Sequence, residues 1–165
     1  MAADTDRIEK QVVLKAPLAR VWRAVSDAKE FGSWFGVALD GSFAPSARLT
    51  GRIVPTTVDP DVAASQKPYE GMKFEIAVEA VEPMSRLSFR WHPFAVDPAT
   101  DYSKEPTTLV VFALEEAPGG TRLTITESGF DRLPAARRAK ALEMNAQGWA
   151  AQARLVEKYL AREAR

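Results

Sequence analysis

The sequence predicts an α+β fold, in which a curved antiparallel sheet of about six or seven strands wraps around a long C-terminal helix. Three observations predict this fold. Two short helical patterns follow the first strand pattern, alternating strand patterns fill the middle of the chain, and one apolar stripe at helical spacing runs through its last part. A twisted sheet fits imperfectly around a single helix, so we expect a cavity between them.

The first part of the chain has the pattern of a strand followed by two short helices. Apolar residues largely share one parity within residues 8–14, which favours a strand. The apolar residues of 18–25 recur at spacings of three and four, which indicates one buried helical stripe. Asp27 and Glu30 have the spacing of a capping box, so a second short helix carrying Trp34 is expected to begin there.

The middle of the chain carries the remaining strand patterns, at residues 37–43, 49–54, 72–81, 87–91, 107–115 and 122–127. Alternation of apolar and charged residues is clearest in 72–81. The sequence Pro118-Gly119-Gly120 is a tight hairpin signal between the last two strands. Residues 55–68 are poor in large apolar side chains and residues 92–106 are rich in Pro and Asp, so both are expected to be surface loops.

A single long helix is predicted from about Leu133 to Ala161. Its apolar stripe recurs at spacings of three and four, at Leu142, Ala146, Trp149, Ala153, Val156 and Leu160. A helix of roughly 25 residues or more is long enough to cross a whole domain. The basic residues that open it fit a solvated face, and they are Arg132, Arg137, Arg138 and Lys140. Since no repeat or linker interrupts the chain, we expect one domain over 1–165, with its core at about 7–161.

Charge and composition exclude several classes of function. The 22 Lys and Arg balance the 22 Asp and Glu, whereas binding to nucleic acid or to an anionic membrane surface normally needs a basic excess. The chain has no cysteine, which excludes disulfides and thiolate chemistry. His92 is the single histidine, and its spacing to Asp97 and Asp101 matches no recognised metal site, so neither a metal nor a cofactor is expected.

The location expected from the sequence is the cytoplasm. Residues 1–10 are polar and charged, unlike a signal peptide. The longest apolar run, residues 109–114, is far too short to insert across a bilayer. The sequence gives no indication of the oligomeric state.

Five motifs, in order along the chain, resemble the START-like (SRPBCC) superfamily, and in particular the branch named for the C-terminal domain of the activator of Hsp90 ATPase. They are P-L-A-R-V-W-R-A-V-S-D at residues 17–27, W-F-G at 34–36, L-S-F-R-W at 87–91, G-T-R-L-T-I-T at 120–126 and G-W at 148–149. The chain departs from the pattern at Glu127, where many members carry histidine. Its segments 55–68 and 92–106 are also longer than the family minimum.

The resemblance implies a helix-grip fold, the name given to a curved sheet that grips a long helix. Members of the superfamily bind lipids, polyketides, hormones or other apolar molecules between sheet and helix, and a minority catalyse cyclisation or dehydration there. The Hsp90 activator combines this domain with a separate N-terminal domain that holds much of the Hsp90 contact. We expect no such second domain in this chain, which lowers the expectation of a co-chaperone.

Four aromatic residues and one carboxylate are the candidate ligand-binding residues: Trp34, Phe74, Trp91, Trp149 and Glu127. Each aromatic ring fits a cavity lining about as well as a packed core. Glu127 shares parity with Leu123 and Ile125, so its strand should point it inward. It is either a polar anchor, or a general acid or base, for a ligand, or else a structural carboxylate paired with an arginine or an indole N–H.

Three functions remain open from the sequence. The first is binding of a small apolar, aromatic or lipid-like molecule in the sheet–helix cavity. The second is a cyclase- or dehydratase-like enzyme in which Glu127 is the acid or base. The third is an Hsp90 co-chaperone that acts through its surface. The sequence lacks a phosphate-binding glycine loop, a nucleophile elbow and a dinucleotide fingerprint, which argues against kinases, common hydrolases and nicotinamide enzymes.

Overall fold

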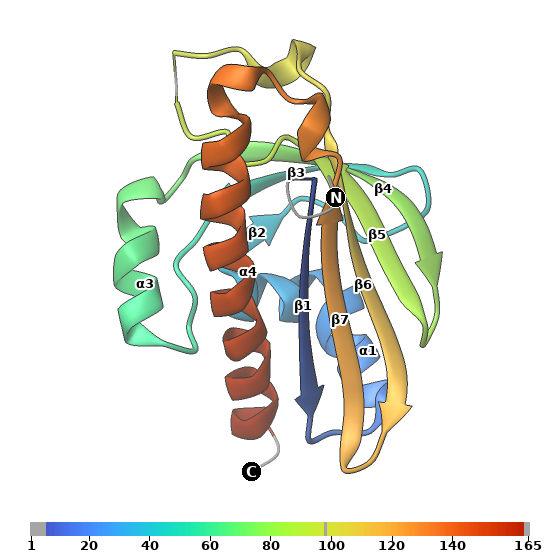
Figure 1. Ribbon diagram of the computed structural model, residues 1–165. Coiled ribbons are helices and arrows are strands. Elements are labelled where there is room, and N and C mark those ends of the chain that lie inside the picture. The colour runs from blue at the N-terminus through green and yellow to red at the C-terminus, as the bar shows by residue number, and fades with distance from the viewer. Residues whose placement is uncertain (1–5, 98, 164–165) are drawn as a thin grey trace.

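The computed structural model of the protein describes residues 6–97 and 99–163 (Figure 1). Residues 1–5, 98 and 164–165 of the predicted domain lie outside the described part. Seven antiparallel strands form one sheet, in the spatial order β1-β7-β6-β5-β4-β3-β2. The strands are β1 (Arg7–Leu14), β2 (Val37–Leu39), β3 (Arg48–Ile53), β4 (Lys73–Glu82), β5 (Arg86–Trp91), β6 (Thr108–Ala117) and β7 (Gly120–Ser128).

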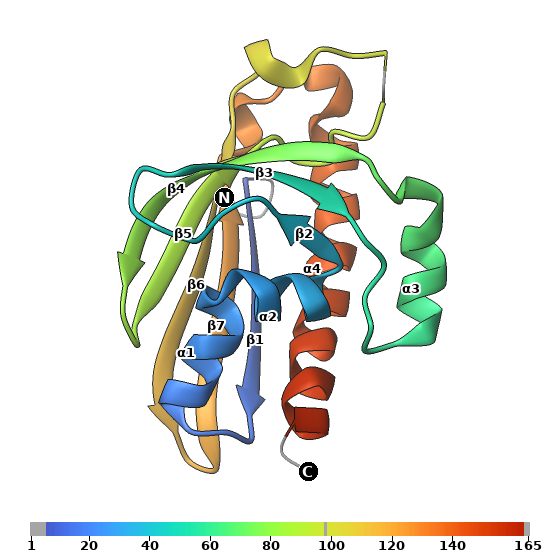
Figure 2. The same cartoon turned by 180° about the vertical axis from the view of Figure 1, so that it is seen from behind.

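The helices are α1 (Leu18–Ser26), α2 (Ala28–Phe35), α3 (Pro60–Gln66), α4 (Ala135–Glu163) and the short 3₁₀ helices η2 (Lys67–Tyr69), η3 (Tyr102–Lys104) and η4 (Phe130–Arg132). Helices α1, α2 and α4 pack against the sheet, whereas α3 lies to one side of the molecule (Figures 1 and 2). Figures 1 and 2 show α4 running the length of the molecule beside β1, with α1 and α2 at one end of the sheet. The predicted α+β helix-grip architecture is confirmed.

Local sequence explains why two helices follow β1 in quick succession. The Asp27 carboxylate accepts hydrogen bonds from the backbone N–H groups of Lys29 and Glu30, which caps α2 as predicted. Gly36 ends α2 in the left-handed conformation with φ of 98°, which favours glycine. The turn from α2 into β2 then places the aromatic side chains of α2 in the core between sheet and α4.

A shared carboxylate fastens α4 to the two short helices. Glu30 of α2 accepts hydrogen bonds from Arg20 of α1 at 2.8 Å and from the Tyr159 hydroxyl of α4 at 2.7 Å. Burial, and then the hydrogen bond to Glu30, raise the pKa of the Tyr159 hydroxyl, so it stays a donor to Glu30 at neutral pH. This contact fixes the C-terminal half of α4 against α1 and α2.

The sheet bends where the register of β4 against β5 shifts, between Val78 and Ala80. Glu79 is the residue between them, and an extra residue of this kind increases local twist. The bend carries β3 and β2 over toward α4 (Figure 2). The outer end of the sheet therefore faces the middle of α4 across a gap, and this gap contains the cavity described below.

Two expectations about local structure were wrong. The predicted loop 55–68 contains α3, which Asp59 caps and Pro60 opens. The predicted strand 37–43 ends at Leu39, because the Asp40 side chain turns to accept a hydrogen bond from the backbone N–H of Thr50. The described residues of 92–106 form a loop, as predicted, apart from the short 3₁₀ helix η3. The long helix begins at Ala135, two residues later than expected, since η4 precedes it.

Within residues 6–97 and 99–163, none of the helices combines the length and the apolar character that crossing a bilayer requires.

Candidate functional site

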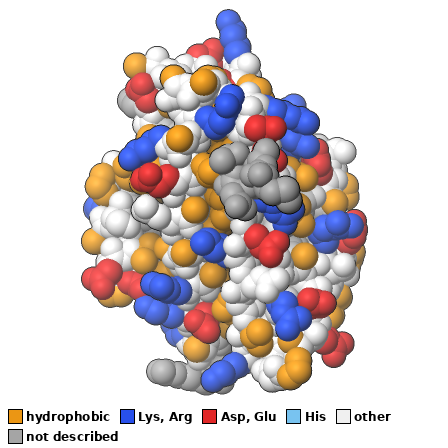
Figure 3. All heavy atoms as spheres, in the orientation of Figure 1, with side chains coloured by type: hydrophobic (Ala, Val, Ile, Leu, Met, Phe, Trp, Pro, Cys, Tyr) orange, Lys and Arg blue, Asp and Glu red, His pale blue; other side chains and the backbone are white. Residues whose placement is uncertain are grey.

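A cavity of about 410 Å³ lies between α4, the outer strands of the sheet and the loop 92–106. Its walls are mainly apolar, and their largest side chains are aromatic: Phe35, Phe74, Trp91, Phe94, Tyr102 and Trp149. Hydrophobic side chains show between the charged ones on the face that carries α4 (Figure 3). A concave, aromatic space of this size matches the sites that hold small organic molecules.

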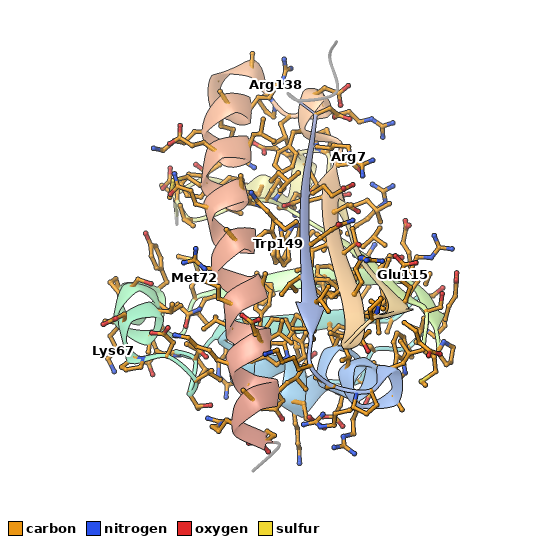
Figure 4. All side chains as sticks on the ribbon, turned by 60° about the horizontal axis from the view of Figure 1, so that its bottom comes forward. Arg7, Lys67, Met72, Glu115, Arg138 and Trp149 are labelled. Carbon is orange, nitrogen blue, oxygen red and sulfur yellow. The ribbon has the colours of Figure 1, made fainter. Side chains whose placement is uncertain are left out.

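Two tryptophans form the inner wall of the cavity. The rings of Trp91 on β5 and Trp149 on α4 lie 5.8 Å apart between centroids, with 31° between their planes. Phe35 packs edge-on against Trp149 at 5.9 Å, and Phe74 packs edge-on against Trp91 at 6.4 Å. Trp149 lies between α4 and the sheet (Figure 4), so the wall joins the two halves of the fold.

Behind this wall lies Glu127, whose side chain is fully buried on the inner face of β7. Its Oε2 accepts hydrogen bonds from Trp91 Nε1 at 2.7 Å and from Thr108 Oγ1 at 2.5 Å. Its Oε1 accepts from Trp149 Nε1 at 2.8 Å and from Asn145 Nδ2 at 2.9 Å. Side chains of β5, β6 and α4 therefore converge on one carboxylate of β7.

The four partners of Glu127 are neutral, and three of them are N–H groups that can only donate. Such a set fits the ionised carboxylate, which accepts four hydrogen bonds and donates none. These contacts orient both indole rings, because each N–H is fixed toward the carboxylate. Glu127 does not itself line the cavity. Its direct effect is to position Trp91 and Trp149.

Two amide side chains on α4 supply polar groups to the cavity wall. Asn145 donates to Glu127, and Gln152 donates its Nε2 to the Phe35 carbonyl at 3.0 Å. The buried Gln152 Oε1 has no hydrogen-bond partner among the described residues. Gly148 lies between them along the helix, and a Cβ there would meet no atom within 4 Å. Asn145 and Gln152 were not among the residues predicted from the sequence, although they share a helix face with Trp149.

The loop 92–106 closes one side of the cavity and is held by Arg137 of α4. The guanidinium donates to Glu105 at 2.8 Å, to the Pro93 carbonyl at 2.9 Å and to the Phe94 carbonyl at 3.2 Å. It also lies over the Tyr102 ring, 4.8 Å from the centroid. Only 18% of the Arg137 side chain is exposed, so the expectation of a solvated residue was wrong for this position.

The two aspartates of this loop stabilise its turns. Hydrogen bonds from the Ala99 backbone and the Thr100 side chain lower the pKa of Asp97. Hydrogen bonds from the Ser103 side chain and backbone lower the pKa of Asp101. His92 Nε2 lies 3.1 Å from the Glu105 carbonyl. No group of three or more potential metal-ligating side chains occurs among the described residues.

Comparison with known families identifies the family of this chain. The model of the family described as Activator of Hsp90 ATPase homolog 1-like protein matches residues 15–161. The chain belongs to this family. The match confirms the resemblance to the START-like superfamily, whose fold commonly binds hydrophobic ligands. No curated protein matched the sequence.

Solved structures share the fold of this Hsp90-activator-like chain. DynU16, a protein in the dynemicin biosynthetic locus, is 25% identical with a TM-score of 0.67, and the alignment covers 94% of this chain and 47% of DynU16. The present chain thus spans about half the length of DynU16. Protein MLL2253 from Mesorhizobium loti is 24% identical with a TM-score of 0.68, over 94% of this chain and 97% of that one. A protein from Arthrobacter aurescens is 16% identical with a TM-score of 0.71, over 96% and 88%.

The fold of the family brings together four of the five predicted site residues. Phe74, Trp91 and Trp149 line the cavity, and Glu127 lies directly behind the two tryptophans. Trp34 lies apart from them. It is fully buried, its Nε1 donates to the Ala24 carbonyl at 2.9 Å, and it is a core residue that does not line the cavity.

Proposed function

We propose that this Hsp90-activator-like protein binds a small apolar or aromatic, lipid-like molecule in the cavity between α4 and the outer strands. The observation that carries the proposal is the aromatic wall, with Trp91 and Trp149 oriented by a buried carboxylate. Burial of apolar ligand surface against such a wall is favourable at roughly 25 cal/mol per Å². Fixing the rings in advance lowers the side-chain entropy that the protein would otherwise lose when a ligand binds.

The enzyme hypothesis gave Glu127 the role of a general acid or base. A group in that role has to reach the proton that it transfers. The four donors around Glu127 and its place behind the tryptophans favour a positioning role. Binding is therefore the function that we propose for the cavity.

Native mass spectrometry of the purified protein, with extraction and identification of bound molecules, tests the proposal. A ligand present at one copy per chain is expected to be apolar and to raise the melting temperature, since a ligand that binds only the folded state stabilises it by about 2.7 kcal/mol at a hundred times its Kd. A protein free of ligand, with no thermal response to a panel of lipids and aromatic compounds, would contradict it.

A variant that fills the cavity provides the matched comparison. Gly148→Leu adds a side chain to the cavity wall at a position with open space, so it is expected to weaken ligand binding while leaving the fold intact. Gln147→Leu is the control, because Gln147 is an exposed neighbour on the same helix that does not line the cavity. Equal loss of binding in both variants would point to an effect on the helix and away from the cavity.

Family membership supports a second proposal, in which the protein stimulates the ATPase of an Hsp90 homologue through its surface. The ATPase rate of the host's Hsp90 homologue, measured with and without this protein, tests that activity. Gly148→Leu should leave a surface activity unchanged while it weakens ligand binding. An unchanged ATPase rate together with no association in a pull-down would remove this second proposal.

A further inference from the structure

The two indole N–H groups of the cavity wall, and one N–H of each amide on α4, are already engaged elsewhere. Trp91, Trp149 and Asn145 each direct an N–H to Glu127, and Gln152 directs one to the Phe35 carbonyl. Each amide nitrogen has a second N–H besides the one used in this way, and each amide also has an oxygen that can accept. Gln152 Oε1 is the clearest case, since it is buried and accepts no hydrogen bond from a described residue. An unpaired buried acceptor is costly, and a ligand donor would satisfy it.

A negative charge also lies close behind the wall. Glu127 is fully buried, and among the described residues no lysine, arginine or histidine forms an ion pair with it. Solvent screens a buried charge much less than an exposed one. The lining contains one further pair of opposite charges, Lys73 and Glu75, both of which are exposed on β4 and offset each other.

The two indole rings extend the electrostatic effect of this carboxylate to the cavity surface. An aromatic face is the negative part of the ring quadrupole and attracts cations. Hydrogen bonds in a chain polarise one another, so donation of the indole N–H to a carboxylate makes the ring richer in electrons. Trp91 and Trp149 both donate in this way, and both line the cavity.

We propose that the cavity selects apolar molecules whose polar end is a hydrogen-bond donor, with a protonated amine bound best, an alcohol less well and a carboxylate worst. This inference rests on the proposed binding function and names its ligand class. Gln152 Oε1 accepts from the donor, while the faces of Trp91 and Trp149 hold the positive charge. A carboxylate ligand would place a second acceptor against Gln152 and a second negative charge near Glu127.

Three compounds with one apolar body test the selectivity: phenylbutylamine, phenylbutanol and phenylbutyrate, titrated calorimetrically into the full chain at neutral pH. The amine is expected to bind at least about tenfold more tightly than the carboxylate, the ratio that one hydrogen bond to a charged group supports. Equal affinities, or tightest binding of phenylbutyrate, would overturn the selectivity and leave the binding function standing. Absence of binding by all three would overturn both.

The variant Gln152→Leu separates this selectivity from general apolar binding. It removes the buried acceptor, and the Phe35 carbonyl keeps the hydrogen bond from Gln66 Nε2 at 3.1 Å, so the fold should persist. The preference for amine over carboxylate is expected to fall by about threefold to tenfold. Gln147→Leu, on the exposed face of the same helix, should retain the preference. A Gln152→Leu protein with a normal melting curve and an unchanged preference would exclude Gln152 as the acceptor.

Discussion

At the scale of single residues, the carboxylate of Glu127 has the largest influence on the site. Replacing it with glutamine, Glu127→Gln, puts an amide NH₂ against indole and amide N–H groups, so buried donors lose their acceptor. We expect a loss of about 2–4 kcal/mol in the free energy of unfolding, measured by urea denaturation. Glu116→Gln, at an exposed position of β6, should change stability by less than about 0.5 kcal/mol. A Glu127→Gln protein as stable as the parent would show that the four donors have other partners.

Two helical glycines allow a matched comparison of free space. A Cβ at Gly148 in α4 would meet nothing, whereas a Cβ at Gly32 in α2 would collide with the Val37 backbone carbonyl. Gly148→Ala is therefore expected to raise the free energy of unfolding by about 0.5–1 kcal/mol, since alanine is the better helix former. Gly32→Ala should lower it by about 1–3 kcal/mol, because the backbone has to shift. A change of the same sign in the free energy of unfolding of both variants would contradict this difference in free space.

At the scale of elements, Arg137 joins the loop 92–106 to α4. Arg137→Leu removes the contacts to Glu105 and to two loop carbonyls, so the loop is expected to become more sensitive to limited proteolysis. Ligand affinity should fall with it, because Phe94 and Tyr102 of the loop line the cavity. Lys140→Ala, one turn further along α4 on its exposed side, is the control. Cleavage of the loop at the parent rate in Arg137→Leu would argue against the contact.

Helix α3 has a pH-dependent anchor at its first turn. The hydrogen bond from Lys158, and then those from the Val62 and Asp61 backbone, lower the pKa of Asp59. Because the folded value is the lower one, this contribution to stability is fully present above the ordinary carboxyl pKa of about 3.9 and is lost as pH falls through the folded value. The amide resonance of Val62 should therefore titrate with a midpoint below about 3.9. In Asp59→Asn that titration should vanish, and its persistence would assign it to another group.

The sequence predicted elements well where a long periodic pattern existed. The alternation of β4 and the stripe of α4 were recognisable because each has one buried face. Helix α3 was missed because it has seven residues and none of them is buried, so no apolar period marks it, although Asp59 and Pro60 are ordinary start signals. The inward direction of Glu127 followed from strand parity. Its four partners did not, because they come from β5, β6 and α4, whose relative placement depends on sheet order and bend.

At the scale of the whole molecule, balanced charge predicts how the protein behaves in solution. Positive and negative side chains are interspersed over the face shown in Figure 3, and the formal net charge is zero. Repulsion between copies is weakest near zero net charge, so solubility should be lowest close to the isoelectric point of about 6.6. Precipitation by polyethylene glycol, measured across neutral pH, should show this minimum. A solubility minimum displaced by two or more pH units would indicate ionisable groups whose pKa values differ from the usual ones.

The pair of neighbouring, tilted indoles has an optical consequence. Chromophores whose centroids lie 5.8 Å apart and whose planes differ by 31° share their excited states, so Trp91 and Trp149 should give a paired positive and negative band in the circular dichroism spectrum. Trp22 and Trp34 lie away from the cavity and contribute a constant background. A guest that alters the angle between the two rings would change the amplitude of the couplet. The chain thus contains its own label-free indicator of cavity occupancy, which Trp91→Phe would switch off.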